Sequence, residues 1–454
     1  MFQPSANRKH SHKNMNPESP SSTTTRRSFL KTSATALTGA AVASTLAPRS
    51  RAADAKPKPI QIALIGCGGR GTGAARDCLA AAQWLNLDVK LTMMADLFKD
   101  RMDRSRGALK DLGVDVPESR CLFGFDAYKK VMESDVDLVL LTTPPNFRSV
   151  HFPAAVAAGK HAFVEKPVAV DPAGYHAIVE AGKIAAQKNL SVVAGTQRRH
   201  EVGYNAVAKL IKDGAIGEIV GGTIHFCLGG GSIPAYTGKE PEWEFLIRHW
   251  GGWAELSGDH IVEQHVHSID VMNWYLGTHP INCVSFGHRA QRKGGNNYDF
   301  FSTDYEFPNN VHIHSMARQV NGCWSRIGQS FRGEKGIAEV TGLVAADRVY
   351  VGSADKKNKL TLPTIEGHKN SYTNEHADLL RSIVEQKPIN EAQQIAESSL
   401  TAVMGRISAY TGQMITWEEM VGSCFTCKPS PKDFAEGTVV MPKAEPTLPP
   451  GKFA

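Results

Sequence analysis

The chain has 454 residues and an ordinary apolar content of 42%, enough for two domains with substantial cores. Its formal net charge is +6, but residues 1–55 hold eight basic and two acidic side chains, which leaves 43 of each in the remainder. This balance gives no support for nucleic-acid binding or for a membrane surface as partner. No apolar run is long enough to span a bilayer.

Residues 1–55 are typical of a twin-arginine export signal. Arg26 and Arg27 precede Ser-Phe-Leu-Lys, a mild apolar run covers 33–46, and Ala53-Asp54-Ala55 forms a small-x-small cleavage site. No cysteine follows the apolar run, which disfavours a lipoprotein anchor. The alternative is a disordered tail with a chance arginine pair. We expect a removed signal, the twin-arginine translocase as a partner during export, and a periplasmic protein.

A strand followed by a glycine-rich turn predicts a dinucleotide site. Residues 60–65 are apolar and run into Gly66-x-Gly68-x-x-Gly71, with a helix-forming stretch behind it. Gly66 permits the tight turn, Gly68 permits close approach of a pyrophosphate, and Gly71 permits helix packing. A second apolar strand, 89–95, ends in Asp96, which we expect to accept the ribose hydroxyls. An acid there repels a 2′-phosphate, so NAD is favoured over NADP.

The following elements predict a parallel sheet and then a sheet-rich domain. Short apolar strands at 137–143, 161–165 and 191–195 alternate with helical stretches near 149–158 and 173–188. Beyond Ala215 the pattern changes to strands, several of them alternating apolar and polar residues as in an antiparallel sheet with one covered face. These strands are expected at 219–228, 283–289, 299–307, 311–319, 325–332 and 337–340, with helices at 374–386 and 391–411.

This order predicts an α/β fold: an N-terminal Rossmann domain plus a C-terminal α+β domain with a large, mostly antiparallel open sheet. The expected parts are the signal at 1–55, the dinucleotide domain at 56–200, a substrate and oligomerisation domain at 201–420 and a loosely held tail at 421–454. Cys424 and Cys427 form the one close cysteine pair, without a second pair or a nearby histidine, so we predict no metal site. A small disulfide and two free thiols are equally open.

Residues 142–167 carry a family resemblance. They read Thr-Thr-Pro-Pro-Asn-Phe-Arg-Ser-Val-His, then Ala-Gly-Lys-His-Ala-Phe-Val-Glu-Lys-Pro. With the glycine turn, this resembles the glucose–fructose oxidoreductase and inositol dehydrogenase (Gfo/Idh/MocA) superfamily, and the likeness runs from about Ile60 to Trp417. The resemblance implies a Rossmann domain, an antiparallel sheet domain and a sugar-type substrate in the cleft between them. We also expect a homo-oligomer formed through the open sheet. The predicted cofactor-binding residues are Gly66, Gly68, Gly69, Arg70, Gly71, Asp96, Thr143, Pro144, Asn146, His151, Glu165, Lys166 and Gln197.

The candidate catalytic residues are Lys166, Glu263, His267 and Asp270. A lysine at a strand end can accept a hydroxyl proton when burial favours its neutral form. If 263–270 is helical, its spacings place Glu263, His267 and Asp270 on one face, while His265 points largely away. We predict that His267 relays protons beside Lys166 and that Asp270 orients it or packs. The family commonly has an aspartate where this chain has Glu263, which leaves the role of that acid and the substrate open.

Weaker candidates line the expected cleft. Arg198 and Arg199 follow the last Rossmann strand and could bind substrate or form a salt bridge between the domains, two readings of equal weight. Asp259 and His260 precede the proposed catalytic helix, together with Trp250 and Trp253. Either tryptophan could stack on a sugar face or plug a core.

The sequence therefore predicts an exported NAD(P)-dependent oxidoreductase that acts on the CH–OH group of a sugar or cyclitol. Because the periplasm offers no free nicotinamide pool, we expect the cofactor to stay bound and to be regenerated in place. One alternative is an NAD-dependent glycoside hydrolase or lyase that oxidises its sugar transiently. Another is a non-catalytic sugar-binding protein, which the presence of both Lys166 and His267 disfavours.

Overall fold

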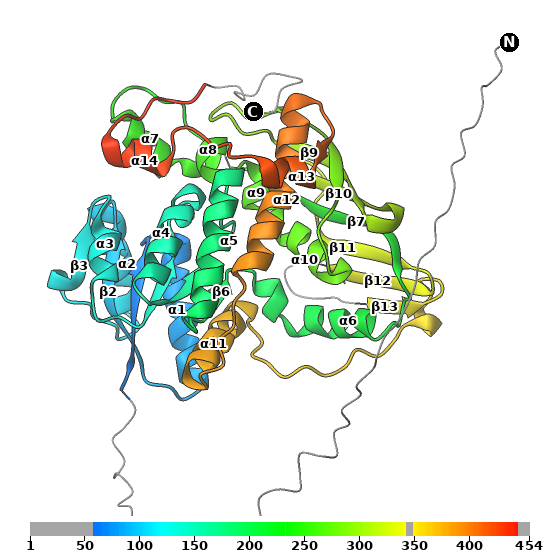
Figure 1. Ribbon diagram of the computed structural model, residues 1–454, viewed down its shortest axis with the longest axis horizontal. Helices are drawn as coiled ribbons and strands as arrows, with labels where there is room; N and C mark the ends of the chain where they lie inside the picture. The colour runs from blue at the N-terminus through cyan, green and yellow to red at the C-terminus, as the bar shows by residue number, and fades with distance from the viewer. Residues whose placement is uncertain (1–57, 232, 342–347, 444–454) are drawn as a thin grey trace, which may run out of the picture. The chain divides into compact units, whose positions relative to one another are not determined.

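The computed structural model describes residues 58–231, 233–341 and 348–443 (Figure 1). The predicted export signal at 1–55 lies outside the described residues. Residues from Lys58 onward form one compact unit, built around two β-sheets. Within the described ranges, no helix combines the length and the apolar content needed to cross a bilayer.

The first sheet has six parallel strands in the order β3-β2-β1-β4-β5-β6. Its strands are short and nearly all apolar, because helices cover both faces of a parallel sheet. Ile62 and Leu64 of β1 face one apolar cluster, and Ala63 and Ile65 face another. The strands are β1 (Ile60–Ile65), β2 (Val89–Asp96), β3 (Cys121–Phe123), β4 (Leu138–Leu141), β5 (His161–Val164) and β6 (Val192–Ala194).

The helices of this domain connect its strands and form the outer layers. Helix α1 packs against α2 on one side, while α4 packs against α3 and α5 on the other. This is the predicted Rossmann arrangement, and its carboxyl strand ends lie along one edge. The helices are α1 (Gly69–Trp84), α2 (Lys99–Lys110), α3 (Ala127–Met132), α4 (Pro145–Ala157) and α5 (Pro172–Gln187).

The second sheet has eight strands in the order β13-β12-β11-β7-β10-β9-β8-β14. All neighbours are antiparallel except β7 and β10. Helices α10 and α12 cover one face, while Phe286 of β8 is 71% exposed. The predicted fold class is confirmed. The strands are β7 (Ile219–Leu228), β8 (Asn282–His288), β9 (Phe300–Phe307), β10 (Val311–Gln319), β11 (Arg326–Gly333), β12 (Gly336–Thr341), β13 (Arg348–Val351) and β14 (Ile415–Thr416).

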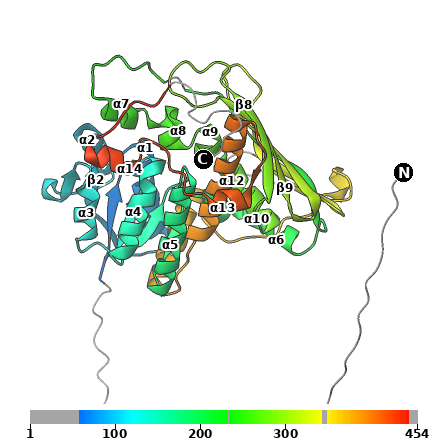
Figure 2. The same cartoon turned by 45° about the horizontal axis from the view of Figure 1, so that its top comes forward.

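The helices after β6 connect the two sheets. Helix α11 returns to the Rossmann layer and packs on α1, although the predicted boundary at 200 assigns it to the second domain. Helix α12 lies between α5 and the second sheet (Figure 2). The helices are α6 (Val202–Lys212), α7 (Glu242–Arg248), α8 (Ala254–Ser257), α9 (His260–Glu263), α10 (Val266–Leu276), α11 (Ser371–Val384), α12 (Ala392–Thr411), α13 (Trp417–Gly422) and α14 (Pro431–Glu436).

The expectation of a loosely held tail after residue 421 is wrong for its described part, which ends at 443. Helix α14 buries Phe434 against the Rossmann domain, because its ring lies 5.5 Å from the ring of Phe147. The Cys427 amide donates to the Asp171 carboxylate at 2.8 Å. Cys427 is buried, Cys424 is exposed, and both are free thiols, which agrees with the second of the two cysteine alternatives.

Candidate active site

The glycine turn after β1 has the shape that a pyrophosphate needs. Gly66 has φ +99°, and a Cβ there would lie 2.7 Å from the Thr143 nitrogen. A Cβ on Gly71 would lie 1.9 Å from the Gly66 carbonyl oxygen, so only glycine lets α1 approach β1 this closely. Cβ atoms on Gly68 and Gly69 would meet nothing within 4 Å. The amide end of α1 therefore faces open space where an anion fits.

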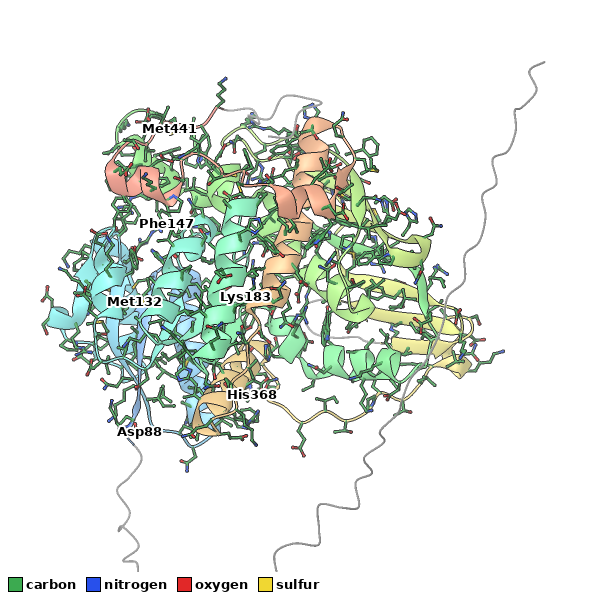
Figure 3. The ribbon with its side chains drawn as sticks, in the orientation of Figure 1. Asp88, Met132, Phe147, Lys183, His368 and Met441 are labelled. Atoms are coloured by element: carbon green, nitrogen blue, oxygen red, sulfur yellow. The ribbon has the colours of Figure 1, made fainter. Side chains whose placement is uncertain are left out.

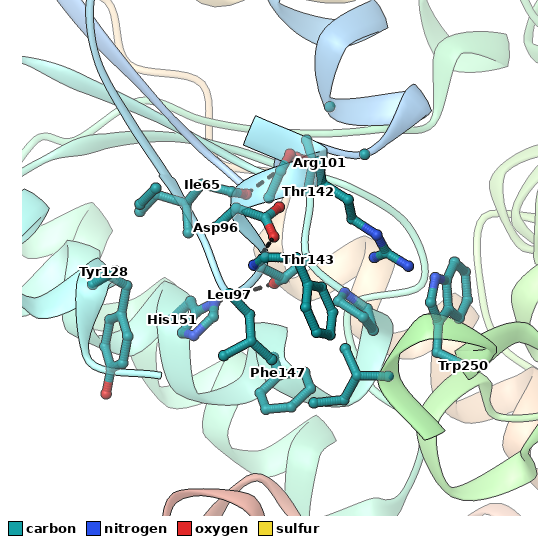
Figure 4. Close-up of a pocket in the computed structure, with 18 of the residues that line it drawn as sticks. Ile65, Asp96, Leu97, Arg101, Tyr128, Thr142, Thr143, Phe147, His151 and Trp250 are labelled. Carbon is teal, nitrogen blue, oxygen red and sulfur yellow. Dashed lines mark hydrogen bonds between the residues drawn. The ribbon is translucent and has the colours of Figure 1, made fainter. Parts of the chain in front are cut away.

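Asp96 ends β2 beside this turn. Its Oδ2 accepts the Cys67 amide at 2.6 Å and its Oδ1 accepts the Phe98 amide at 2.8 Å. Burial raises the pKa of Asp96, and the two amide hydrogen bonds oppose that shift. The carboxylate lines a pocket across the carboxyl ends of β1, β2 and β4 (Figure 4). It keeps free lone pairs for ribose hydroxyls while bracing the glycine turn.

The walls of this pocket come from both halves of the chain. Tyr128 and Trp250 mark opposite sides in Figure 4, and Trp250 belongs to the part of the chain after β7. Ile247 joins Trp250 in the wall, whereas Trp253 is buried in a core cluster. The other lining residues are Ile65, Gly66, Gly68, Gly69, Arg70, Gly71, Ala95, Asp96, Leu97, Phe98, Arg101, Gly124, Phe125, Ala127, Thr142, Thr143, Pro144, Phe147 and His151.

Four cofactor-binding residues predicted after β4 divide between this pocket and another. Thr143, Pro144 and His151 line it, and Thr143 Oγ1 lies 3.1 Å from His151 Nδ1. Burial lowers the pKa of His151 to about 3, so this ring stays neutral. Asn146 instead lines a separate pocket with Asp171 and Cys427. The structure therefore does not bring Asn146 to the predicted cofactor position.

A network of side chains joins the glycine turn to the ends of β5 and β6. It includes Arg70, Glu165 and Gln197. Arg70 Nε lies 2.9 Å from Glu165 Oε1, and Glu165 Oε2 accepts the Lys166 amide at 3.1 Å. The Arg70 guanidinium lies 4.8 Å from the ring centre of Tyr372. The Tyr372 hydroxyl accepts from Gln197 Nε2 at 3.2 Å. These predicted cofactor residues thus form a protein network beneath the strand ends, in which Glu165 is already paired.

Lys166 meets Glu263 between the two sheets. The Lys166 ammonium donates to the Glu263 carbonyl at 2.6 Å and lies 3.3 Å from Glu263 Oε1. Both side chains are largely buried, with 12% and 19% exposed. The longer acid at 263 therefore reaches the lysine that follows β5. The predicted pair is brought together by contact between residues 97 positions apart.

His267 lies close to this pair, but the expected continuous helix is wrong. Helix α9 ends at Glu263 and α10 begins at Val266, and the His265 ring between them lies 2.6 Å from Ser315 Oγ. The His267 ring stacks on Phe226 at 6.4 Å. Burial, and then the Lys166 ammonium, hold the pKa of His267 well below its usual value. The imidazole is therefore neutral, and the predicted relay stays a prediction.

Asp270 and Arg199 bind each other. Arg199 Nε and Nη2 donate to the two Asp270 oxygens at 2.8 and 2.9 Å, and Ser398 donates to Asp270 at 2.9 Å. The two readings of Arg199 are therefore resolved in favour of the salt bridge between η2 (Gln197–His200) and α10. Asp270 is buried in this joint, and its predicted role of orienting or packing stays a prediction.

The remaining weak candidates are buried. Asp259 accepts the Tyr298 amide at 2.8 Å and the Tyr410 hydroxyl at 2.5 Å, and burial raises its pKa to about 6. Burial lowers the pKa of His260 to about 3. Arg198 donates to Ser268 at 3.2 Å inside the second domain. Asp259 therefore fastens the loops around α9, and none of the three lines the dinucleotide pocket.

The sequence interpretation missed Arg148. Its guanidinium donates to the Thr143 and Pro167 carbonyls at 2.8 and 2.5 Å, and burial lowers its pKa to about 10. It links the loops after β4 and β5, which carry Thr143 and Lys166. Lone arginines on helices give no such signal in a single sequence, because most of them face solvent. Among the described residues no group of three or more His, Cys, Asp or Glu could hold a metal ion.

The comparisons with known families agree with this architecture. Residues 60–195 match the model described as "Oxidoreductase family, NAD-binding Rossmann fold", and residues 204–339 match "GFO/IDH/MocA C-terminal domain". Together the matches cover more than half of the chain. The chain belongs to the Gfo/Idh/MocA superfamily, and its first domain is an NAD-binding Rossmann fold. The glycine turn and Asp96 fit that cofactor, as predicted.

Individual relatives match a part of their length. The chain is 30% identical over 158 residues to an inositol 2-dehydrogenase of Klebsiella pneumoniae, covering 35% of this chain and 43% of the relative. It is 28% identical over 166 residues to a glycosyl hydrolase family 109 protein of Streptomyces coelicolor, covering 36% and 33%. The matches thus span less than half of either relative.

Solved structures share the fold. A scyllo-inositol dehydrogenase from Lactobacillus casei with bound NAD(H) and scyllo-inositol superposes with a TM-score of 0.60 at 18% identity. The superposition covers 81% of this chain and all of that one. Both domains, in the same order, are therefore shared with that protein at the level of fold.

Proposed function

We propose that this protein is an exported oxidoreductase that transfers a hydride between a tightly bound NAD and the CH–OH group of a sugar or cyclitol. The observation that carries the proposal is the contact of Lys166 with Glu263 beside neutral His267. It brings proton-transfer groups from both domains to the end of β5, next to the NAD-binding strand edge. The inositol 2-dehydrogenase relative supports the substrate class.

The chain supplies the proton chemistry of this reaction. When bound, NAD supplies the hydride acceptor. Lys166 and His267 would share the hydroxyl proton of the substrate, and Glu263 would hold the Lys166 ammonium toward the cleft. Arg148 would keep the loops after β4 and β5 in register by its two carbonyl contacts. Water exclusion would follow from the burial of these side chains.

Export and cofactor retention belong to the same proposal. The paired arginines at 26 and 27 support transport of a folded protein, and a folded protein can carry its cofactor with it. We propose the periplasm as its location and the twin-arginine translocase as its transient partner. A second copy would bind on the open face of the eight-stranded sheet, where exposed Phe286 supports an apolar contact.

A second candidate function is redox-neutral sugar cleavage. The similarity to a glycosyl hydrolase family 109 protein favours it. In that reaction bound NAD would supply a reversible hydride acceptor, elimination from the transient ketone would cleave the glycosidic bond, and water would add to the unsaturated product before the ketone is reduced again. The same Lys166 and His267 would serve, and the bound cofactor would show no net change after turnover.

The test uses protein purified from the periplasm. Mass spectrometry of the cofactor released on unfolding should find NAD, and sugars or cyclitols should then reduce the bound cofactor, seen by its near-ultraviolet absorbance. Lys166→Met should retain the cofactor but lose its reduction. Lys183→Met is the matched control, because Lys183 is exposed on α5 and pairs only with nearby Glu180.

The products distinguish the candidates. A sugar ketone or lactone supports the oxidoreductase, whereas a released aglycone without net oxidation supports cleavage. Full activity in Lys166→Met contradicts both mechanisms. Sugar binding without any cofactor reduction would favour the non-catalytic binding protein.

A further inference from the structure

A segment from the far end of the chain packs behind residues that line one side of the dinucleotide pocket. The C-terminal segment, residues 423–443, starts beside α5, where Asp171 accepts the Cys427 amide at 2.8 Å. It ends beside α7, where Glu242 accepts the Met441 amide at 3.0 Å. Between these attachments α14 lies near α7 on the Rossmann side in both views (Figures 1 and 2). Figure 3 labels Phe147 and Met441 on this side of the molecule.

Aromatic rings fill the space between this segment and the pocket. The Phe434 ring lies 5.5 Å from Phe147 and 6.4 Å from Phe125. The Trp243 ring lies 5.6 Å from Phe125 and 6.2 Å from Phe98. Phe98, Phe125 and Phe147 themselves line the dinucleotide pocket. We call these five residues the aromatic wall, of which Phe434 and Trp243 form the outer layer.

A polar contact closes the wall on the α2 side. The Arg248 guanidinium lies 3.9 Å from the ring centre of Phe98 and 3.1 Å from Asp100 Oδ1. The Arg248 carbonyl accepts from Arg101 at 3.2 Å. Ile247, next in the chain, lines the pocket. Segments 148 residues apart are thereby joined beside the end of β2, where Asp96 lines the pocket.

We propose that the C-terminal segment and α7 close the adenosine side of the pocket and prevent NAD from exchanging. The inference rests on the proposed function, since it gives the tightly bound cofactor a structural cause. Release of the adenosine would require the outer layer, Phe434 and Trp243, to separate from Phe98, Phe125 and Phe147. That separation exposes packed aromatic surface, and its free-energy cost slows dissociation of the cofactor. It has a smaller effect on the polar contacts of the bound cofactor.

The test measures release of NADH from the purified full chain. Protein loaded with NADH is mixed with excess NAD, and the loss of bound NADH fluorescence gives the release rate. Phe434→Ala removes the outer ring, and Arg248→Ala removes the contact with Phe98 and Asp100. Each should release NADH about tenfold faster or more. Val440→Ala, a change in the same segment at a 73% exposed side chain, should release it at the unaltered rate.

The outcomes separate the two proposals. If Arg248→Ala and a folded Phe434→Ala both release NADH at the unaltered rate, the inference is overturned. The proposed NAD binding and sugar oxidation would not be affected by that result. If Phe434→Ala does not fold, the rate for Arg248→Ala decides alone. An unaltered chain that binds no NADH overturns the proposed function as well. With saturating added NAD, faster-releasing variants should recover sugar oxidation, which separates retention from catalysis.

Discussion

At the residue scale, two histidines that are two positions apart in the sequence, His265 and His267, have different environments. The Lys166 ammonium acts electrostatically on the His267 ring, which stacks on Phe226. His265 is fully buried and contacts Ser315. Both have pKa values held well below the usual range by burial. The break between α9 and α10 places the His265 ring against Ser315 of β10.

His267→Ala is therefore expected to lower turnover by about 10²–10⁴-fold, because the proton acceptor beside Lys166 is lost. His265→Ala should instead lower the melting temperature, since it empties a buried site and leaves Ser315 without its ring partner. Steady-state kinetics and thermal unfolding on both variants make the comparison. Equal losses of turnover in the two variants would contradict the assignment of His267 as the proton relay.

Asp96 governs the choice of dinucleotide. Asp96→Ala should weaken NAD binding by about 1–3 kcal/mol and NADP binding by less, because the change removes a hydroxyl acceptor and relieves repulsion of a phosphate. Calorimetry on cofactor-stripped protein measures both affinities, with Asp88→Ala at the exposed start of β2 as control. Equal weakening of the two dinucleotides would mean that Asp96 acts only by bracing the Cys67 and Phe98 amides.

At the scale of elements, His200 joins three segments. It follows β6, its Nδ1 lies 2.7 Å from Asp378 of α11, and its Nε2 lies 3.3 Å from Glu391 before α12. Burial alone would lower the pKa of His200, but Glu391 and Asp378 raise it to about 10. The ring is therefore charged at neutral pH, and this buried contact fastens α11 and α12 to the Rossmann sheet.

The raised pKa makes this joint dependent on pH. Its stabilisation is fully present below the usual histidine pKa of 6.5 and is lost as the pH rises through about 10. His200→Gln should cost about 3–5 kcal/mol of unfolding free energy near pH 6, and less near pH 10. Urea unfolding at several pH values measures this difference.

His312→Gln provides the control for that experiment. His312 lies 2.7 Å from Asp304, but its side chain is 45% exposed, so the pair is screened and should cost under about 1 kcal/mol. A pH-independent loss in His200→Gln would show that its ring acts by packing and not by charge.

At the scale of the whole molecule, the net positive charge falls within the predicted export signal. The net charge of +6 belongs to residues 1–55, and the remainder is balanced. Replacing Arg26 and Arg27 with lysine keeps this charge, yet it should leave the precursor uncleaved in the cytoplasm if the pair is read by the translocase. Cell fractionation with immunoblotting detects the change. The matched control replaces Arg49 and Arg51 with lysine, and normal export of the Arg26 and Arg27 variant would refute the assignment.

Much of the architecture could be predicted from local pattern. β1, β2 and β4 are apolar runs bounded by glycine, proline or a polar residue, and the alternation in β9 and β10 predicts one covered face. Local pattern failed at the end of the chain, where proline and lysine suggested a loose tail. Phe434 is one apolar residue in a polar stretch, and its partners Phe125 and Phe147 lie about three hundred positions earlier.

The sequence by itself determined the dinucleotide turn. It also gave grounds to expect an NAD preference from Asp96 and a catalytic role for Lys166, because these expectations depend on residues close together in the chain. Only the tertiary structure decided that Asp270 binds Arg199, that Arg148 links two loops and that Phe434 of the C-terminal segment packs near Phe147. The physical reason is that a charge or ring far from its partner in sequence carries no periodic signal. Its role follows from which surfaces burial brings into contact.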